Sequence, residues 1–395
     1  MLSVILPNRI RLAVVTETWP PEVNGVAHTI AHLVRGLREL NEYQIQLVRP
    51  RQLTDGEPAT DADFEEYLVS GLSLPFYKEV RVGAPQFFAL RQQWKQQRPD
   101  IVQIVTEGPL GYSALRAAKS LGIPVFSDFH TNFDQYSQHY HLKYGFELAG
   151  RYLRHVHNQT LRTLVPTTEL INQLADNGYK NLGILERGID AKLFTPERRS
   201  QTLRAQYGIA EDQLLVVLVT RMAQEKNLDL AFEAFRAIQQ SQPDAQFLLV
   251  GDGPERARLA ALHPDCIFAG MQTGTSLAEH YASGDLFLYA STSETFGNVI
   301  IEAMASGLPV VTYDYAAAHK YIDSGHNGYT APFNDSQAFV QGAVALANQP
   351  KLRRQMGIQA RQTAQQLSWE SVVLRLDTII KSLLSEVNHE TSASA

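Results

Sequence analysis

The feature that most constrains the fold is the alternation of short, branched apolar runs with longer amphipathic stretches. In the first half of the chain the apolar runs span residues 10–16, 45–48, 101–105, 125–129 and 161–165. Helical patterns lie between them, at residues 29–40, 84–97 and 111–121. Strands that are buried on both faces of a parallel sheet have this continuous apolar character, and helices connect them. The first half therefore predicts an α/β domain with a parallel sheet.

The same alternation starts again after about Arg187. The second set of apolar runs spans residues 214–220, 247–250, 266–269, 286–289 and 310–313. A chain of 395 residues with 44% hydrophobic residues is also longer than one core usually serves. We predict two Rossmann-like, doubly wound parallel-sheet domains, covering residues 1–187 and 188–367. The last helical pattern, within residues 368–388, is expected to cross back onto the first domain.

Two segments lack these patterns. Residues 54–66 are acidic and rich in turn-forming residues, which predicts a surface loop. Residues 388–395 are polar and small, which predicts a disordered tail. No repeat of fixed period occurs, and this argues against a solenoid.

Composition excludes several classes of protein. The formal net charge is -6, from 35 basic and 41 acidic residues, so no overall attraction to nucleic acid is expected. Cys266 is the only cysteine, which excludes an intrachain disulfide and a thiolate metal cluster. Arg9 and Arg11 interrupt the apolar start before a signal-peptide core forms, and no apolar run is long enough to span a bilayer. We expect a cytoplasmic protein that is at most peripheral to a membrane.

Two cations follow the first predicted strand of the second domain, in the segment RMAQEKNLD. Ligands of open α/β sheets bind at the carboxyl ends of the strands, where Arg221 and Lys226 would lie. An arginine fork and a mobile lysine suit a diphosphate and can stabilise the charge that develops as it leaves. Solvated charges at a helix start have the same spacing, so the spacing alone leaves both interpretations open.

A Gly-Asp-Gly turn follows the next strand. Gly251, Asp252 and Gly253 would let a ligand approach the backbone because the glycines have no side chain. The same three residues can simply reverse the chain. This signal is therefore weak when it is taken alone.

The segment SETFGNVIIEAMASGLPVV predicts a strand end, a loop and a helix start. At the helix start, some backbone N–H groups would be free to bind a phosphate. They are the N–H groups of Phe296, Gly297, Asn298 and Val299. Glu302 lies one helical turn after Asn298 on the same face, where its carboxylate suits ribose hydroxyls better than phosphate. Glu294, in the loop before the helix, is placed to accept hydrogen bonds from sugar hydroxyls.

Glu294 and Glu302 form an E-x7-E pattern, and together with the motifs above they resemble retaining glycosyltransferases of family 4 (group 1). This family has the GT-B fold, two Rossmann-like domains facing a cleft, and the resemblance covers nearly the whole chain. It implies that Arg221 and Lys226 bind the diphosphate of a nucleotide sugar, with the turn at residues 251–253 on the base side. It also implies that Glu302 binds the ribose and Glu294 contacts the transferred sugar.

The first half carries further parts of this resemblance. The segment TETWPPEVNGVAHTIAHL is similar to the family's opening loop, which implies that Gly25 approaches both the donor phosphate and the acceptor. The segment DFHTNF implies that His130 lies near the anomeric carbon, although a structural turn and a structural histidine are the alternatives. Glu107, followed by Gly-Pro after another strand, is a further candidate for ligand contacts. The sequences of these two segments resemble most those of lipid mannosyltransferases and sulfoquinovosyl-lipid synthases.

Other histidines do not suggest a metal site. The His-x-His pairs at residues 139–141 and 155–157 would point to different helical faces, with no cluster of carboxylates or cysteines nearby. The resemblance implies that neither a metal nor another cofactor is needed, because Arg221, Lys226 and the helix dipole serve the phosphates. The absence of a GxxxxGK[ST] motif argues against a phosphate-loop kinase.

The acceptor is expected to be a lipid or glycan. Residues 77–98 combine five basic residues with Phe87, Phe88 and Trp94, which suits contact with an anionic membrane surface. Packing of these aromatic residues on the sheet is the alternative. A second basic region spans residues 139–157. In the segment ERGID, Arg187 replaces the asparagine of many such enzymes, which indicates the lipid-directed subgroup or adds a surface charge near the hinge.

The resulting hypothesis is transfer of a hexose from GDP-mannose or a UDP-hexose to a lipid or glycan hydroxyl at the cytoplasmic membrane face. Retention of configuration follows from the resemblance alone, and a front-face route is favoured because no carboxylate stands out as a nucleophile. A GT-B sugar-nucleotide epimerase and a non-catalytic nucleotide-binding module are the alternatives. No motif identifies the base or the sugar of the donor.

Overall fold

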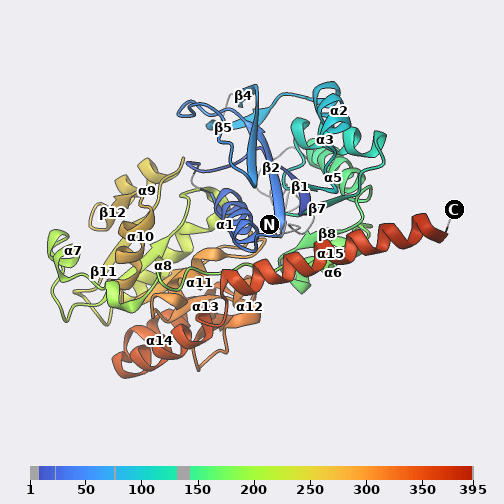
Figure 1. Ribbon diagram of the computed structural model, residues 1–395. Helices are drawn as coiled ribbons and strands as arrows, with labels where there is room; N and C mark the ends of the chain where they lie inside the picture. Colours follow the sequence, from blue (N-terminus) through green and yellow to red (C-terminus); the bar gives the residue numbers. More distant parts are fainter. Residues whose placement is uncertain (1–8, 23, 75–76, 131–142, 394–395) are drawn as a thin grey trace, which may run out of the picture. The chain divides into compact units, whose positions relative to one another are not determined.

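The computed structural model describes residues 9–22, 24–74, 77–130 and 143–393 (Figure 1). The chain divides into two compact units. Unit 1 contains the described residues up to Arg187 together with the C-terminal segment from Trp369, and unit 2 contains Gly188–Ser368.

Unit 1 is built on a parallel sheet of seven described strands. In sheet order they are β3 (Phe64–Val69), β2 (Tyr43–Pro50), β1 (Ile10–Val15), β6 (Ile101–Ile104), β7 (Val125–Asp128), β8 (Thr163–Val165) and β9 (Leu182–Ile184). A separate antiparallel ribbon is formed by β4 (Gly71–Leu74) and β5 (Tyr77–Gly83). The apolar runs predicted the five inner strands but missed β3 and β9, because edge strands are only partly buried and lack a continuous apolar run. The predicted loop at residues 54–66 is accordingly wrong at its end, where β3 begins.

Helices pack on this sheet, and local signals fix where they start. They are α1 (Gly25–Glu39), α2 (Phe87–Gln96), α3 (Pro109–Ser120), α5 (Lys143–His157), α6 (Thr168–Asp176) and α15 (Trp369–Ala393). The side chain of Asn24 caps α1 by accepting from the N–H groups of Val26 and Ala27. Thr167 caps α6 in the same way, and α3 begins with a proline, which suits the first turn of a helix.

The helix α15 belongs to unit 1 although the chain reaches it only after unit 2. Its residues Val373, Leu376 and Ile380 are buried in one cluster with residues of α1, β1 and β2. A β-carbon on Gly36 of α1 would lie 2.3 Å from Val373, so a glycine is needed where the two helices touch. The helix continues to Ala393, which corrects the prediction of a disordered tail from residue 388.

Unit 2 contains a second parallel sheet, with six described strands. Their order is β12 (Ile267–Gly270), β11 (Gln246–Val250), β10 (Leu215–Val219), β13 (Leu286–Tyr289), β14 (Val310–Tyr313) and β15 (Gly328–Ala331). Alternate residues of β10 enter two different apolar clusters, so both faces of this sheet are buried. The unpredicted strand, β15, is again an edge strand that contains glycine and threonine.

The connections of unit 2 are mostly helical. The helices are α7 (Gln201–Gln206), α8 (Leu228–Gln239), α9 (Arg256–Leu262), α10 (Gly274–Ala282), α11 (Asn298–Ala305), α12 (Ala317–Tyr321), α13 (Ser336–Ala347) and α14 (Pro350–Ala364). Two short 3₁₀ helices, η1 (Pro196–Arg198) and η2 (Gln224–Lys226), complete the unit.

The predicted α/β class with two doubly wound parallel sheets is confirmed. In each sheet the strand order reverses at one place, between β1 and β6 in unit 1 and between β10 and β13 in unit 2. Ligands of open α/β sheets bind outside the carboxyl ends of the strands at such a reversal. The loops after these four strands are therefore the first places to look for function.

Candidate active site

Lys226 and Glu294 meet where the strand order of unit 2 reverses. Lys226 ends η2, which follows β10, and Glu294 lies in the loop between β13 and α11. The Nζ atom of Lys226 lies 2.5 Å from Oε1 of Glu294, and each side chain is 14% exposed. The sequence predicted both residues as ligand contacts but not their ion pair.

Three donors converge on the same oxygen of Glu294. Besides Lys226, the hydroxyl groups of Tyr289 and Ser291 donate to Oε1, over 2.5 and 2.7 Å. Burial would raise the pKa of Glu294, but the Lys226 charge and these hydrogen bonds outweigh burial and lower it. Glu294 is therefore an oriented carboxylate, and an oxygen that accepts three hydrogen bonds is a poor nucleophile.

Arg221 follows β10 directly and is more accessible than Lys226. Its side chain is 45% exposed, and its Nη1 atom lies 3.9 Å from Oε1 of the buried Glu225. Arg221 and Lys226 thus lie on the one loop that leaves the carboxyl end of β10. This position suits a guanidinium that binds an incoming anion.

The start of α11 requires Gly297. This residue has a φ of +98°, a left-handed conformation that favours glycine, and it is the N-cap of the helix. The Phe296 side chain is buried and contacts Tyr321 edge-on, so only its backbone remains for a ligand. The first N–H groups of α11, those of Asn298 and Val299 included, have no acceptor within the helix. These are the N–H groups that the sequence assigned to a phosphate, and anion binding there stays a prediction.

Glu302 lies one turn further along α11. Its Oε2 atom accepts a hydrogen bond of 2.8 Å from the hydroxyl of the buried Tyr281. Burial raises the pKa of Glu302 to about 7, against the lowering effect of that hydrogen bond. The carboxyl group can therefore gain or lose a proton near neutral pH.

The Gly-Asp-Gly turn supports the loop that carries Arg221. Gly251 has a φ of +128°, and a β-carbon there would lie 2.0 Å from the Thr220 carbonyl oxygen. A β-carbon on Gly253 would lie 2.3 Å from the Met222 carbonyl oxygen. The backbone carbonyl of Asp252 accepts from Met222 N–H at 2.9 Å. The glycines thus have a packing role, and contact with a base stays a prediction.

Gly25 of unit 1 is exposed in the first turn of α1. The Asn24 side chain already accepts from Val26 and Ala27, at 3.1 and 2.8 Å. These two N–H groups are therefore occupied, and the approach of Gly25 to a phosphate stays a prediction.

His130 and Arg187 contact one another inside unit 1. The Nη2 atom of Arg187 lies 2.5 Å from Nδ1 of His130, and both side chains are buried. Arg187 is therefore not the surface charge that the sequence allowed for. Burial lowers the pKa of His130, and the Arg187 charge lowers it further.

Glu107 follows β6 and forms a buried polar chain. Its Oε1 atom lies 2.9 Å from Nε2 of His157, whose Nδ1 lies 2.9 Å from the Ser127 hydroxyl. His155 is exposed while His157 is buried, so these two histidines do lie on different helical faces. His139 and His141 fall outside the described residues. Among the residues with assigned positions, no three His, Cys, Asp or Glu side chains gather as a metal site would require.

Glu17 was missed by the sequence reasoning. It follows β1 at the strand reversal of unit 1, and its Oε1 atom accepts from Leu110 N–H at 2.9 Å, at the start of α3. Burial raises the pKa of Glu17 to about 7, opposed by that hydrogen bond and reinforced by the charge of Glu107. The one available signal was an acidic residue directly after a predicted strand.

Comparison with models of known protein families shows the family to which the chain belongs. The model for Glycosyltransferase Family 4 matches residues 23–193, and the model for Glycosyl transferases group 1 matches residues 199–363. Together the two models cover most of the chain. The chain belongs to the family 4 (group 1) glycosyltransferases.

Relatives of this glycosyltransferase are similar over most of their length. The GDP-mannose-dependent alpha-mannosyltransferase of Mycobacterium tuberculosis is 29% identical over 374 residues, covering 92% of this chain and 94% of that protein. The sulfoquinovosyl transferase SQD2 of Arabidopsis thaliana is 27% identical over 378 residues, covering 93% and 72%. Among solved structures, the sucrose-phosphate synthase of Thermosynechococcus elongatus has a TM-score of 0.77 at 18% identity, covering 96% and 100%. The GT-B fold that the sequence predicted is confirmed.

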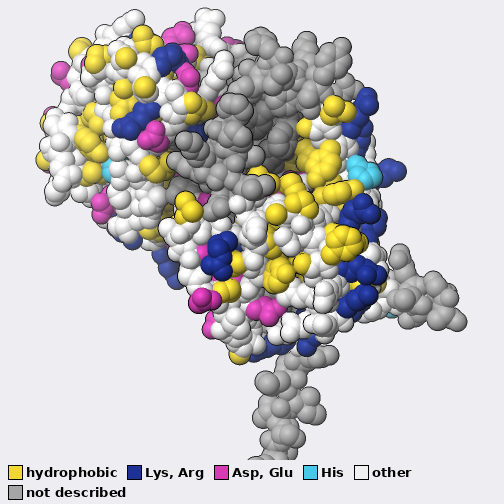
Figure 2. Space-filling model, turned by 90° about the horizontal axis from the view of Figure 1, so that it is seen from above, with side chains coloured by type: hydrophobic (Ala, Val, Ile, Leu, Met, Phe, Trp, Pro, Cys, Tyr) yellow, Lys and Arg dark blue, Asp and Glu magenta, His cyan; other side chains and the backbone are white. Residues whose placement is uncertain are grey.

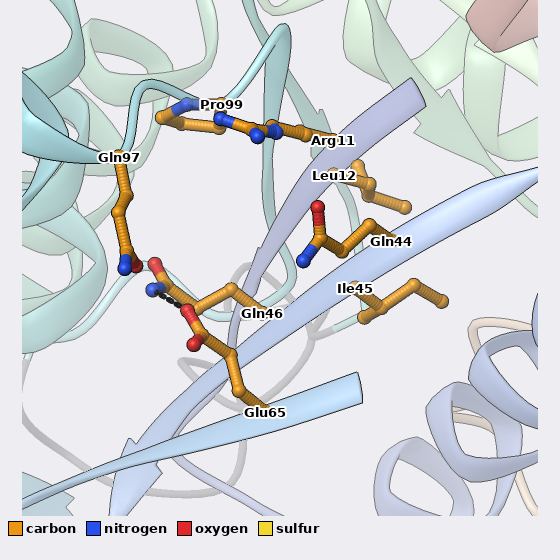
Figure 3. Close-up of a pocket in the computed structure, with 8 residues that line it drawn as sticks. All are labelled: Arg11, Leu12, Gln44, Ile45, Gln46, Glu65, Gln97 and Pro99. Carbon is orange, nitrogen blue, oxygen red and sulfur yellow. Dashed lines mark hydrogen bonds between the residues drawn. The ribbon is translucent and has the colours of Figure 1, made fainter. Parts of the chain in front are cut away.

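A cavity of about 130 Å³ in unit 1 of the glycosyltransferase does not coincide with these residues (Figure 3). It lies at the amino ends of β1 and β2, the edge opposite the one where Glu17 lies. Figure 3 shows the side chains of Gln46 and Glu65 pointing toward one another, and Gln46 donates to Glu65 over 2.5 Å. Trp94 in turn donates to Gln46 over 2.8 Å. Two of the polar side chains that line this cavity, Gln46 and Glu65, satisfy one another, and we do not assign the cavity a ligand.

The basic and aromatic segment of the glycosyltransferase divides between core and surface. Trp94 is buried, as the packing alternative required, whereas Phe88 is 83% exposed. The side chains of Lys78 and Arg81 lie outside the described part. On α5, Leu148 is 66% exposed. Figure 2 shows hydrophobic side chains beside Lys and Arg side chains over this part of the chain.

We call the exposed residues Phe88, Lys95, Leu148, Arg151 and Tyr152 the α2–α5 surface. The helix α3 joins its two sides, because Arg116 lies over the Phe87 ring and Tyr112 contacts Tyr152. No described helix is both long and apolar enough to cross a bilayer.

Proposed function

We propose that this glycosyltransferase moves a hexose from a nucleotide-diphosphate sugar, GDP-mannose or a UDP-hexose, to a hydroxyl of a lipid or glycan. The observation that carries the proposal is the Lys226–Glu294 ion pair at the strand reversal of unit 2, beside the start of α11. The name of one relative supports the donor class, since that mannosyltransferase depends on GDP-mannose.

In this proposal each group of unit 2 serves one part of the donor. Arg221, Lys226 and the N–H groups of α11 hold the diphosphate and stabilise its charge as the bond to the sugar breaks. Glu294 accepts from a sugar hydroxyl through Oε2, because Oε1 already receives three donors. Glu302 accepts from the ribose hydroxyls.

We further propose retention of configuration by a front-face route. The acceptor oxygen bonds to the anomeric carbon on the face from which the diphosphate leaves, and the acceptor proton passes to the departing phosphate oxygen. The hydrogen bonding of Glu294 supports this route. The Oε1 atom of this carboxylate accepts from Lys226 and from two hydroxyl groups, which makes that oxygen a poor nucleophile. No metal enters the scheme, since the cationic side chains supply the positive charge.

The test combines each donor with a panel of lipid and glycan acceptors. We expect a glycosylated product from GDP-mannose or a UDP-hexose, detected by mass spectrometry, with the donor's anomeric configuration by NMR and undiminished yield in EDTA. Conversion of the sugar when donor is incubated alone would support an epimerase instead. Nucleotide binding without any turnover would support a non-catalytic module.

Nucleotide affinity should depend on the protonation of Glu302. The pKa of this residue is raised to about 7 by burial, and only its deprotonated form accepts hydrogen bonds from two ribose hydroxyls. Below pH 7 binding must release a proton, so the Kd of GDP or UDP should rise about tenfold per pH unit down to the pKa of the bound state. Isothermal titration between pH 5.5 and 8.5 measures this. Glu302→Gln should bind more weakly at high pH and show no such slope.

Location at the cytoplasmic membrane face is also a proposal, carried by the α2–α5 surface. The protein should float with vesicles that contain anionic lipid and not with neutral vesicles. Phe88→Ser should reduce binding about tenfold, because an inserted phenylalanine contributes at least about 1.5 kcal/mol. Ile358→Ser is the matched control, since Ile358 is 59% exposed on α14 of unit 2. If both variants float as well as the wild type, the α2–α5 surface does not bind the membrane.

A further inference from the structure

The contact between Arg187 and His130 fixes where the imidazole proton lies. The two residues come from different strand ends, His130 from the loop after β7 and Arg187 from the segment after β9. Nη2 of Arg187 lies 2.5 Å from Nδ1 of His130, inside unit 1. A guanidinium has five N–H donors and no acceptor, so Nδ1 must accept.

An imidazole that accepts at Nδ1 carries its proton on Nε2. A second proton on Nδ1 would face the Arg187 N–H and place two cations in contact inside the unit. Both side chains are at least nine-tenths buried, so water screens this repulsion little. The geometry alone therefore selects the neutral Nε2–H form of His130.

The Nε2–H group is left with an unfilled hydrogen bond. Within the described residues Nε2 of His130 has no hydrogen-bond partner, although it is buried. The Oδ2 atom of Asp128 lies 3.6 Å away and already accepts from Gln103 at 2.6 Å. A buried donor without a partner is costly, and a substrate oxygen would satisfy it.

We propose that Arg187 is a positioning residue that holds His130 as the neutral Nε2–H tautomer, so that His130 donates a hydrogen bond to a hydroxyl oxygen of the substrate. The assignment of a sugar or polyol hydroxyl rests on the proposed function. In this role His130 is a donor and not a general base, because the nitrogen left for substrate already carries the proton.

The charged groups around His130 agree with this assignment. Burial and Arg187 lower its pKa, while Asp128 on β7 and Glu107 after β6 raise it, and the net direction is downward. The pKa of Arg187 itself falls only to about 10 through burial, so the guanidinium stays charged at neutral pH. Loss of Arg187 would leave burial alone to lower the pKa of His130, against the two carboxylates that raise it.

The test is nitrogen NMR of histidine-labelled, full-length protein without substrate. Two-bond nitrogen–proton correlations distinguish the two tautomers and the imidazolium, and His130→Gln identifies the His130 signals among those of the 12 histidines. We expect wild-type His130 to show the Nε2–H pattern from pH 5.5 to 8 without titrating. Arg187→Met should show mixed tautomers, and the pKa of His130 should rise so that imidazolium appears as the pH falls through this range.

Activity gives the second readout. Arg187→Met should lower turnover about tenfold at neutral pH and further below pH 6.5, as imidazolium forms. Arg187→Lys keeps a cationic donor and should retain the wild-type NMR pattern and most of the activity. If Arg187→Met does not fold, Arg187→Gln replaces it, since an amide can donate or accept and should also release the tautomer.

Two results would overturn the proposal. One is a wild-type His130 that shows the Nδ1–H pattern or titrates between pH 5.5 and 8. The other is an unchanged His130 pattern in the folded Arg187→Met or Arg187→Gln variant, even if activity is lost, because Arg187 would then be merely structural. The NMR experiment uses no substrate, so its outcome is separate from that of the transferase assay.

Discussion

Replacing Lys226 by alanine is expected to lower kcat about 100- to 1,000-fold while the fold stays intact. Loss of one preorganised donor at a developing anion typically costs this much. The variant also removes the cation that lies 2.5 Å from Glu294, and the pKa of Glu294 should rise as a result. Initial rates with saturating donor and acceptor measure the effect.

Lys351→Ala is the matched control, because this lysine is exposed on α14 of the same unit. It should keep wild-type kcat. Thermal unfolding of both variants should occur near the wild-type midpoint, which separates chemistry from stability. Near-normal turnover of Lys226→Ala would exclude Lys226 from the diphosphate site.

Glu294→Gln is expected to lower kcat/KM for the nucleotide sugar about 100-fold. The amide oxygen can still accept from Lys226, Tyr289 and Ser291, so the loop before α11 should keep its shape. The loss falls on the second oxygen, where an amide N–H would meet the sugar hydroxyl in place of a charged acceptor. Steady-state kinetics over a range of donor concentrations measure it.

The nucleotide alone separates the role of Glu294 from that of Glu302. Glu294→Gln should bind GDP or UDP within about threefold of wild type, because neither contains the transferred sugar, whereas Glu302→Gln should lose nucleotide affinity directly. If Glu294→Gln weakens the nucleotide and the nucleotide sugar equally, Glu294 does not contact the sugar.

The inner part of each sheet could be predicted from the sequence, because complete burial has a local signature. The structure has β13 and β14 at the residues that the apolar runs indicated. At three of the four edges of the parallel sheets, β3, β9 and β15 are incompletely buried and mix polar or small residues with apolar ones, so they carry no such signature. The fourth edge strand, β12, is also only partly buried but has an apolar run, and it was predicted. The edges form because a neighbouring strand offers unpaired backbone groups, which a local window cannot detect.

The candidate site shows the same limit for side chains. Arg221 and Lys226 could be placed after β10 because a short stretch of sequence contains both the strand and the cations. The partner of Lys226 lies 68 positions away, and Arg187 lies 57 positions from His130. Only the strand order brings such residues together, which is why the sequence left a surface charge open as one interpretation of Arg187.

The position of α15 at the end of the sequence determines the order in which the two units can fold during synthesis. Unit 1 begins with β1, yet its core includes Val373, Leu376 and Ile380, which the ribosome adds only after all of unit 2. Until then the part of α1 around Gly36, against which Val373 packs, lacks its cover. The half of the molecule that is made earlier is thus the half that is completed later.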